Sequence, residues 1–381
     1  MASRSPSTPE SPSRRLPEGP VTVIGVGLMG GSLGLALRRA GVTPIRGVDP
    51  DPRALEDAAR LGAVDATTTS IAEGVAGAAS VVIAAPVPRI PDLAREVFVH
   101  APADCLVTDI GSAKRAVVDA LSAEDRVRFV GGHPICGGEQ CGVGFAREDL
   151  FNGATWFLTP TAETRPDLYE RAHSLVAATG AVPTAISAGV HDRLMALVSH
   201  VPHVLASALI DQAANTAPEG REALRSAGPS FDDLTRVAGS NPPLWADILL
   251  ANRAALVETL GEYRERLDVI AAAVMAGDRA AIESFFAQAA DARDRLRAAQ
   301  RAQDAVDPWE VTAVIPDQPG TVSDIATALG HAHINIRDLV LHPGPPGGVG
   351  ELVLRIGGAE DARAAAAMIR DRGYTVWAAP A

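Results

Sequence analysis

A glycine-rich turn directly after a short apolar run constrains the fold of this chain more than any other feature. The run at 21–26, VTVIGV, is β-branched and apolar, and the glycines that follow have the spacing GxGxxG. The first glycine of such a turn permits a tight bend and the second lets the backbone approach a pyrophosphate. The third lets the next helix pack closely on the strand. The pattern predicts a dinucleotide site at Gly25, Gly27, Leu28, Met29 and Gly30.

An acidic residue stands at the end of the second apolar run, where a dinucleotide-binding fold places the ribose contact. Asp49 follows the run 45–48, IRGV. Its carboxylate would accept hydrogen bonds from ribose hydroxyls and repel a 2′-phosphate, which favours NAD over NADP. Two readings stay open here. Asp49 can simply begin the DPDP turn, and the nearby Arg53 leaves some tolerance of NADP.

Apolar runs alternate with Ala-rich helical stretches over the first half of the chain. This alternation is typical of βαβ units, so we expect an α/β domain with a Rossmann-type parallel sheet over 21–187. Residues 1–20 lack an apolar core segment and are rich in Ser and Pro, which predicts a disordered tail and not a signal peptide. The expected elements after the first strand are strands at 45–48, 81–85, 105–109, 127–130, 155–159 and 182–186, and a helix at 166–179.

Strand signals disappear between 188 and 303, which predicts an all-α domain. The segment 191–213 has apolar residues at helical spacing, with a kink expected at Pro202. The segment 244–275 repeats apolar residues every seven positions, and two such rows make a seam for a partner helix. That seam fits either packing within the chain or a dimer interface. The polar stretch 293–307 reads as a linker.

The last segment, 309–381, has a third pattern. Its strand and helix signals follow the order βαββαβ, which is the ferredoxin-like arrangement, with PGPPGG as the hairpin loop between the second and third strands.

Composition excludes several functional classes. The 381 residues include 34 Lys and Arg against 46 Asp and Glu, and the net charge of −12 argues against a nucleic-acid binder. No run of about eighteen apolar residues lacks charges or turn signals, which argues against a membrane protein. The three cysteines (Cys105, Cys136 and Cys141) form no CxxC pair, so neither a disulfide framework nor a zinc site is expected. A reduced, cytoplasmic setting follows.

Two further stretches follow predicted strands, where open α/β sheets bind their ligands. One is TDIGSAK at 108–114, which contains the only lysine of the chain, Lys114. The other is GGHPICGGE at 131–139. A histidine after a strand is usually structural, but glycines and a proline bracket His133, clear space around it and fix its direction.

With these motifs the chain resembles the prephenate/arogenate dehydrogenase family of tyrosine biosynthesis. The matching features are GVGLMGGSL, the acid at Asp49, TDIGSAK, GGHPICGGE, SHVPH and TRVAGSNPPLW, which occur in the right order from 21 to about 300. The resemblance implies NAD-dependent hydride transfer from ring C4 of prephenate, with loss of the ring carboxylate as CO₂. The product would be 4-hydroxyphenylpyruvate, and the protein would be a homodimer.

The resemblance also assigns roles to single residues. His133 matches the catalytic histidine, which accepts the proton of the C4 hydroxyl. Ser112 matches a serine that hydrogen-bonds this hydroxyl and touches the nicotinamide, although N-capping of a helix is an alternative role. Arg236 matches the arginine that binds the side-chain carboxylate, which a planar guanidinium can grip with two hydrogen bonds.

Further matches surround the expected pocket. His203 and His191 match polar groups of the substrate site, and Glu139 matches an acid near the pocket entrance. Trp245 matches an aromatic residue that lines the pocket, and core packing is an equal alternative for it. His200 and His203 have the spacing of a metal pair, but no acidic ligand accompanies them, so we expect no metal.

The sequence departs from the family pattern at a few positions. Cys136 and Gly138 stand where alanine and threonine or serine are common, and Asp232 stands where a cation can occur beside the arginine. These departures leave the chemistry intact, but they keep open whether prephenate or arogenate is preferred.

Residues 309–381 resemble an ACT domain, a regulatory module that binds amino acids. The resemblance implies contacts to an effector from Asp317, Gly320 and Asn335, with tyrosine as the natural candidate. Alternatively, the segment is only a dimerisation element.

Two rival functions remain. A β-hydroxyacid dehydrogenase would need a catalytic lysine in the second domain, and this chain has no lysine after Lys114. A non-catalytic sensor of NAD or an amino acid would bind NAD without turnover.

Overall fold

The computed structural model describes residues 18–137, 140, 142–215, 224–304, 308–316, 318, 320–332, 334–342 and 349–380. Several of the predicted features fall on other residues: most of the N-terminal tail, Glu139, Asp317, the hairpin loop at 343–348 and residues 305–307 of the predicted linker lie outside the described residues. The chain forms two units, one that extends to Asp268 and one that begins at Val269, and each is described by itself.

The first unit contains an eight-stranded sheet among its described residues, in the order β3-β2-β1-β4-β5-β6-β7-β8. The six strands from β3 to β6 in this order are parallel, as expected, but β7 is antiparallel to β6. The short strand β3 was not predicted, because its three residues, ATT, give no apolar run. The strands are β1 Val21–Ile24, β2 Ile45–Val48, β3 Ala66–Thr68, β4 Ser80–Ile83, β5 Leu106–Asp109, β6 Phe129–Pro134, β7 Thr155–Thr159 and β8 Val182–Ala185.

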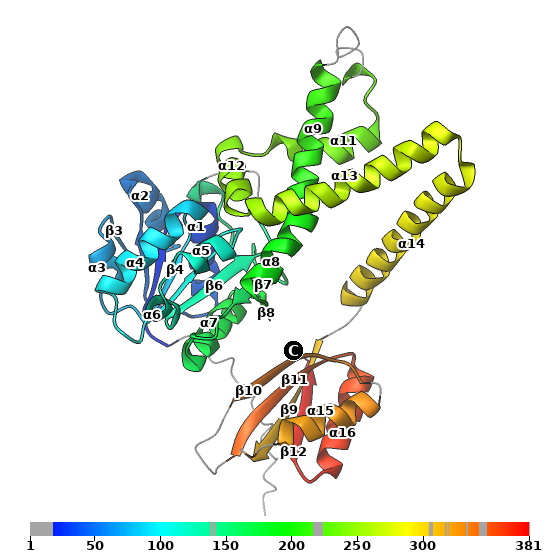
Figure 1. The fold of residues 1–381 in the computed structure, drawn as a ribbon. Coiled ribbons are helices and arrows are strands. Elements are labelled where there is room, and N and C mark those ends of the chain that lie inside the picture. The colour runs from blue at the N-terminus through cyan, green and yellow to red at the C-terminus, as the bar shows by residue number, and fades with distance from the viewer. Residues whose placement is uncertain are drawn as a thin grey trace, which may run out of the picture. The chain divides into compact units, whose positions relative to one another are not determined.

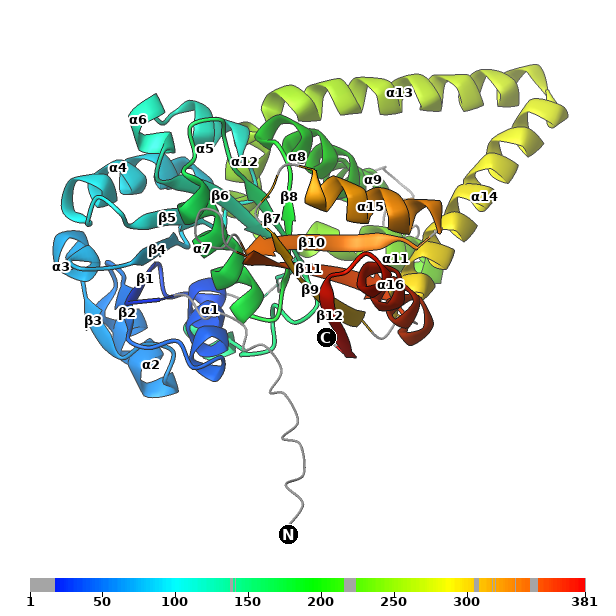
Figure 2. The same cartoon turned by 90° about the horizontal axis from the view of Figure 1, so that it is seen from below.

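Helices cover both faces of this sheet, as a largely parallel sheet requires (Figures 1 and 2). One face packs against α1, α2 and α7, and the other against α3, α4 and α5. The elements are α1 Leu28–Arg39, α2 Pro52–Leu61, α3 Ile71–Val75, η1 Val87–Arg89, α4 Ile90–His100, α5 Arg115–Asp119, α6 Ala123–Arg126, η2 Val143–Phe145 and α7 Pro166–Ala178.

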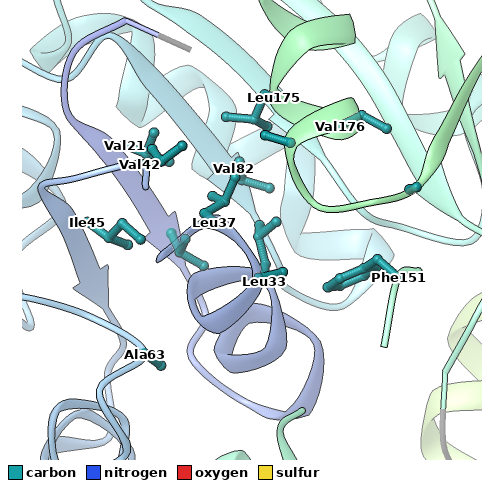
Figure 3. Packing of buried hydrophobic residues seen from close by; sticks show 14 of the residues in the cluster. Val21, Leu33, Leu37, Val42, Ile45, Ala63, Val82, Phe151, Leu175 and Val176 are labelled. Carbon is teal, nitrogen blue, oxygen red and sulfur yellow. The ribbon is translucent and has the colours of Figure 1, made fainter. Parts of the chain in front are cut away.

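The helix that follows the glycine turn is the centre of one buried layer. Leu33 and Leu37 of α1 point at Val82 of β4, with Phe151 and Leu175 beside them (Figure 3). Each such fully buried leucine contributes about 2 kcal/mol of transfer free energy. This packing fixes the start of α1 against the carboxyl edge of the sheet, where the dinucleotide turn lies.

The predicted catalytic histidine lies inside a strand and not after one. The sequence placed the strand end at residue 130, but β6 continues to Pro134 and pairs His133 with Phe157 of β7. The extension has a steric reason. A side chain on Gly131 would meet the Thr159 hydroxyl at 2.4 Å, and one on Gly132 would meet the carbonyl oxygen of Asp109 at 2.4 Å. Glycine therefore permits a close approach of β6 to its neighbours.

Helices alone follow β8 in the described part of the first unit. A π-helical turn, η3, ends two residues before Pro202, where the sequence predicts a kink. Because Pro202 has no N–H and its ring crowds the preceding turn, a wider turn relieves the conflict. The elements are α8 Ala188–Met195, η3 Ala196–His200, α9 Val201–Asn215, α11 Pro229–Thr235, η4 Arg236–Gly239, α12 Pro242–Ala251 and α13 Arg253–Ala276.

The helical run Ala188–Asn215 has the length and composition of a membrane span, with a mean hydropathy of 1.5. It also contains His191 and Asp192, which are buried. Core helices of water-soluble proteins pass the same test, so this run alone does not indicate a membrane protein.

The seven-residue repeat proves to be divided between two helices. Asn252 separates α12 from α13, so the seam is not one continuous helix. Leu256 is buried, whereas Leu267 of the second row is 47% exposed. Packing within the described chain therefore covers only part of the seam.

The second unit contains a four-stranded antiparallel sheet with the order β10-β11-β9-β12. Two helices, α15 and α16, contribute to its core with Ile325, Leu329 and Ile369. The expected linker at 293–307 is wrong for residues 293–304, because the helix α14 continues through them. The elements are α14 Arg279–Asp304, β9 Pro308–Pro316, α15 Thr321–His331, β10 Ile336–His342, β11 Val349–Gly357, α16 Ala359–Asp371 and β12 Thr375–Pro380.

Candidate active site

The three glycines of the turn differ in what surrounds them. Gly25 has a φ of +91°, and a side chain on Gly30 would meet the carbonyl oxygen of Gly25 at 1.9 Å. A side chain on Gly27 would meet nothing within 4 Å. Gly25 and Gly30 are therefore required by the protein's own backbone, whereas the space at Gly27 is open at the start of α1. This open space beside a helix N-terminus fits the pyrophosphate of NAD.

This contrast predicts that alanine substitutions at the two positions affect different properties, stability in one case and nucleotide binding in the other. Gly30→Ala is expected to lower the free energy of unfolding by about 3 kcal/mol, because the backbone must move. Gly27→Ala is expected to leave stability unchanged and to raise the Kd for NAD⁺ at least about tenfold. Urea unfolding and fluorescence titration with NADH measure the two effects. Tight nucleotide binding by Gly27→Ala would place the pyrophosphate elsewhere.

Asp49 lies directly after β2 and forms a hydrogen bond with the backbone of the glycine turn. Its Oδ2 accepts a hydrogen bond from the N–H of Val26 at 3.0 Å, and its Oδ1 accepts one from the N–H of Asp51 at 2.9 Å. Each oxygen keeps a further acceptor position, so the contact that begins the DPDP turn does not exclude a hydrogen bond to a ribose hydroxyl. The carboxylate begins the DPDP turn and remains suited to ribose hydroxyls.

A buried ion pair connects the ends of β5 and β6. The side chains of Lys114 and Asp109 are fully buried, and the ammonium contacts the Asp109 carboxylate. The same ammonium donates to the carbonyl oxygen of Gly132 at 2.7 Å. Asp109 in turn accepts from the N–H groups of Gly111 and Gly132. The only lysine therefore anchors the residue that precedes His133.

Three side chains form a line from the strand edge into α8. The His133 Nδ1 atom lies 2.8 Å from Nε2 of His191, and the Nδ1 atom of His191 lies 2.8 Å from Oδ1 of Asp192. The His191 ring is fully buried and also meets the Phe157 ring edge to face. His133 is only half-buried.

The surroundings keep the His133 imidazole neutral. Burial lowers the pKa of His133 well below the ordinary value of 6.5, and His191, Lys114 and His200 lower it further. Burial also lowers the pKa of Lys114, against the attraction of Asp109. A neutral imidazole is suited to accept a proton near neutral pH.

The helical part contributes a second group of rings. His203 stacks on Trp245 with ring centroids 3.6 Å apart, and its Nδ1 donates to the carbonyl oxygen of Ser199 at 2.9 Å. His200 meets the edge of Trp245, and its Nδ1 lies 3.2 Å from the amide nitrogen of Asn252. Both histidines thus have partners other than a metal. Among the described residues, no group of three or more His, Cys, Asp and Glu could hold a metal ion.

Comparisons with known proteins agree on one family. A model described as "Prephenate dehydrogenase, nucleotide-binding domain" matches residues 33–184, and one described as "Prephenate dehydrogenase, dimerization domain" matches 187–288. Prephenate dehydrogenase of Bacillus subtilis is 32% identical over 326 residues, which are 84% of this chain and 87% of the relative. The chain belongs to the prephenate dehydrogenase family.

Solved structures of this family have the same fold. Prephenate dehydrogenase from A. aeolicus, in complex with hydroxyphenyl propionate and NAD⁺, matches with a TM-score of 0.70 and 30% identity, over 74% of this chain and 99% of that one. Arogenate dehydrogenase from Synechocystis matches with a TM-score of 0.66 and 28% identity, over 73% and 99%. The family and its Rossmann-like and helical parts are thus as predicted.

The structure brings some of the expected family residues together and leaves others apart. His133 and His191 are in contact, and His203 and Trp245 form a separate stack. Ser112 is half-buried beyond β5 and does not cap α5, whose N-cap is Lys114. Arg236 begins η4 and is exposed. Trp245 is half-buried and contacts two site histidines, which fits a lining residue as well as core packing.

Two residues of this network were missed by sequence reasoning. Asp192 accepts hydrogen bonds from the N–H groups of Lys114 and Arg115. It therefore caps the N-terminus of α5 although it lies far away in the sequence. Asn252 donates to the carbonyl oxygen of Asp192 at 2.7 Å. The signal for Asn252 was a polar residue within the apolar seam. Asp192 gave no signal beyond its position next to His191.

Proposed function

We propose that this enzyme oxidises prephenate to 4-hydroxyphenylpyruvate and CO₂ with NAD⁺. The main support is the neutral His133 imidazole, held at the sheet edge that also bears the dinucleotide turn. Family membership supplies the substrate class. When bound, NAD⁺ accepts the hydride from ring C4.

The residues of the chain then need to accept the proton of the C4 hydroxyl and return it to the product oxygen. His133 accepts the C4 hydroxyl proton as the carbonyl forms. Loss of the ring carboxylate as CO₂ gives an aromatic phenolate, and the proton returns to its oxygen. Ser112 hydrogen-bonds the C4 hydroxyl and touches the nicotinamide in this proposal. The gain in aromaticity makes the step effectively irreversible.

Substrate binding falls to the helical part in this proposal. Arg236 binds the side-chain carboxylate, and His203 and Trp245 form a wall of the pocket. Their stacked rings support this role, because a fixed aromatic surface orients a flat ring substrate. His191 belongs to the same site through its contact with His133. Glu139 stays a proposed residue of the pocket entrance.

Two alternatives to this function, an arogenate dehydrogenase and a non-catalytic sensor, can be distinguished by rate measurements. The likeness to an arogenate dehydrogenase favours arogenate as the second candidate substrate. Initial rates of reduced cofactor formation with prephenate or arogenate, each with NAD⁺ or NADP⁺, distinguish the cases. Prephenate with NAD⁺ is the expected pair. Turnover of arogenate alone would change the substrate, and NAD⁺ binding without any turnover would indicate a sensor.

The pH dependence follows from the lowered pKa of His133. The base works in its neutral form and is lost when it is protonated. Because its pKa lies well below 6.5, kcat/KM for prephenate is expected to stay level from about pH 7.5 down to 6.5 and to fall only at lower pH. A pH–rate profile in constant-ionic-strength buffers measures this. An acid limb centred at or above 6.5 would contradict the assignment.

The exposed apolar residues of the helical part support a homodimer. Leu197 and Val198 of η3 are 58% and 57% exposed, and Val257 of α13 is 69% exposed. Exposed apolar side chains of this size are common at protein interfaces. We propose that a second copy covers them, which also explains the membrane-like composition of Ala188–Asn215. A dimeric, cytoplasmic enzyme follows.

The second unit is an ACT-like regulatory domain in this proposal, with a ferredoxin-like arrangement. Its support is the order of its helices and strands around one antiparallel sheet. Gly320, with a φ of +96°, precedes α15, and Asn335 is exposed at the start of β10. We propose that they bind tyrosine together with Asp317. Calorimetric titration with tyrosine, together with inhibition kinetics, tests this; no heat and unchanged rates would leave a dimerisation element.

A further inference from the structure

The line from Asp192 through His191 to His133 determines which nitrogen of each ring bears a hydrogen. Asp192 is held as a carboxylate. Burial alone would raise its pKa, but hydrogen bonds from His191 and from the N–H groups of Lys114 and Arg115 lower it below the usual value. An ionised carboxylate only accepts, so the Nδ1 atom of His191, 2.8 Å away, bears the hydrogen.

The same logic continues to His133. A neutral His191 with its hydrogen on Nδ1 has a lone pair on Nε2. The His133 Nδ1 atom lies 2.8 Å from that lone pair, so it is the donor of this hydrogen bond. The second nitrogen of His133, Nε2, is then left without a hydrogen and with its lone pair available.

We infer that His191 and Asp192 are positioning residues that hold His133 as its Nδ1–H tautomer and so make Nε2 the base. This inference rests on the proposed function, in which His133 accepts the hydroxyl proton. Neither His191 nor Asp192 needs to touch the substrate for this role. The Phe157 ring and the fully buried site of His191 hold its orientation.

A pair of variants at His191 tests the accepted hydrogen bond. Glutamine can present its carbonyl oxygen near the position of Nε2, whereas leucine fills the site without an acceptor. We expect His191→Leu to lower kcat at least about tenfold with little change in KM, and His191→Gln to stay within about threefold of wild type. Arg193→Gln, an exposed change on the same helix, is the control.

The tautomer itself can be measured without turnover or substitution at His191. Histidine side-chain ¹⁵N NMR of the full-length wild-type protein is expected to show His133 protonated on Nδ1, with the signal assigned by its loss in His133→Asn. An Nε2–H form would overturn the inference. So would wild-type kcat in His191→Leu, or equal losses in the leucine and glutamine variants. If the wild-type protein turned over neither prephenate nor arogenate, the proposed function would be overturned instead. The NMR result on the tautomer would remain valid in that case.

Discussion

Replacing His133 with asparagine is expected to lower kcat for prephenate oxidation about 10³-fold. The asparagine amide reproduces Nδ1 of the imidazole, so it can still donate to His191, but it has no group at the position of Nε2. The substitution therefore removes the base and keeps its anchor. Steady-state kinetics measure the loss, and the Kd for NAD⁺ and the thermal midpoint should remain near wild type.

A matched control is available on the surface of the same unit. His100 ends α4 and is exposed, so His100→Asn makes the same chemical change away from the site. Its kcat should equal that of wild type. A His133→Asn enzyme with more than about a tenth of wild-type kcat would show that another group takes the proton.

The second large effect is expected at Lys114. Lys114→Met keeps most of the side-chain volume but leaves the Asp109 carboxylate buried without its cation. Breaking a buried pair in this way costs about 3–5 kcal/mol of unfolding free energy. Urea unfolding of the full-length protein, monitored by tryptophan fluorescence, measures it. The loss of activity should follow the loss of stability, because Lys114 holds Gly132 next to the proposed base.

A control variant and a double variant test whether the loss of stability comes from the buried ion pair. Arg115→Met removes a neighbouring cation whose ion pair with Asp119 is exposed, and should change stability by less than about 0.5 kcal/mol. Adding Asp109→Asn to Lys114→Met should recover part of the stability, since no unpaired charge then remains. If Lys114→Met is as stable as wild type, the ion pair is not what joins β5 to β6.

Local patterns in the sequence were sufficient for most of the first unit. Local patterns of apolar residues and glycines predicted the strand before the GxGxxG turn, the helix after it and the strand before Asp49, and the structure has β1, α1 and β2 at these places. The end of β6 was wrong for a physical reason. Glycines usually end a strand, but here Thr159 and Asp109 approach β6 so closely that only glycines at 131 and 132 can continue it.

Long-range polar contacts were beyond sequence reasoning. Asp192 lies 78 positions from Lys114, and Asn252 lies 60 positions from Asp192. No periodicity links such residues, because each pair is formed by docking of separate elements. Lys114 stands out in the sequence as the only lysine, but its complete burial and its hydrogen bond to the carbonyl oxygen of Gly132 depend on the packing of β6 beside β5.

The origin of the ring that contacts His133 has a consequence for how such an enzyme can evolve. The proposed base belongs to β6, whereas His191 and Asp192 belong to α8, the first helix after the sheet. A fragment ending at Ala185 would retain every glycine of the nucleotide turn but would lack the hydrogen-bond acceptor of its base. The residues of the nucleotide turn thus lie within the part of the chain that ends at Ala185. The proposed proton transfer needs residues both from that part and from α8.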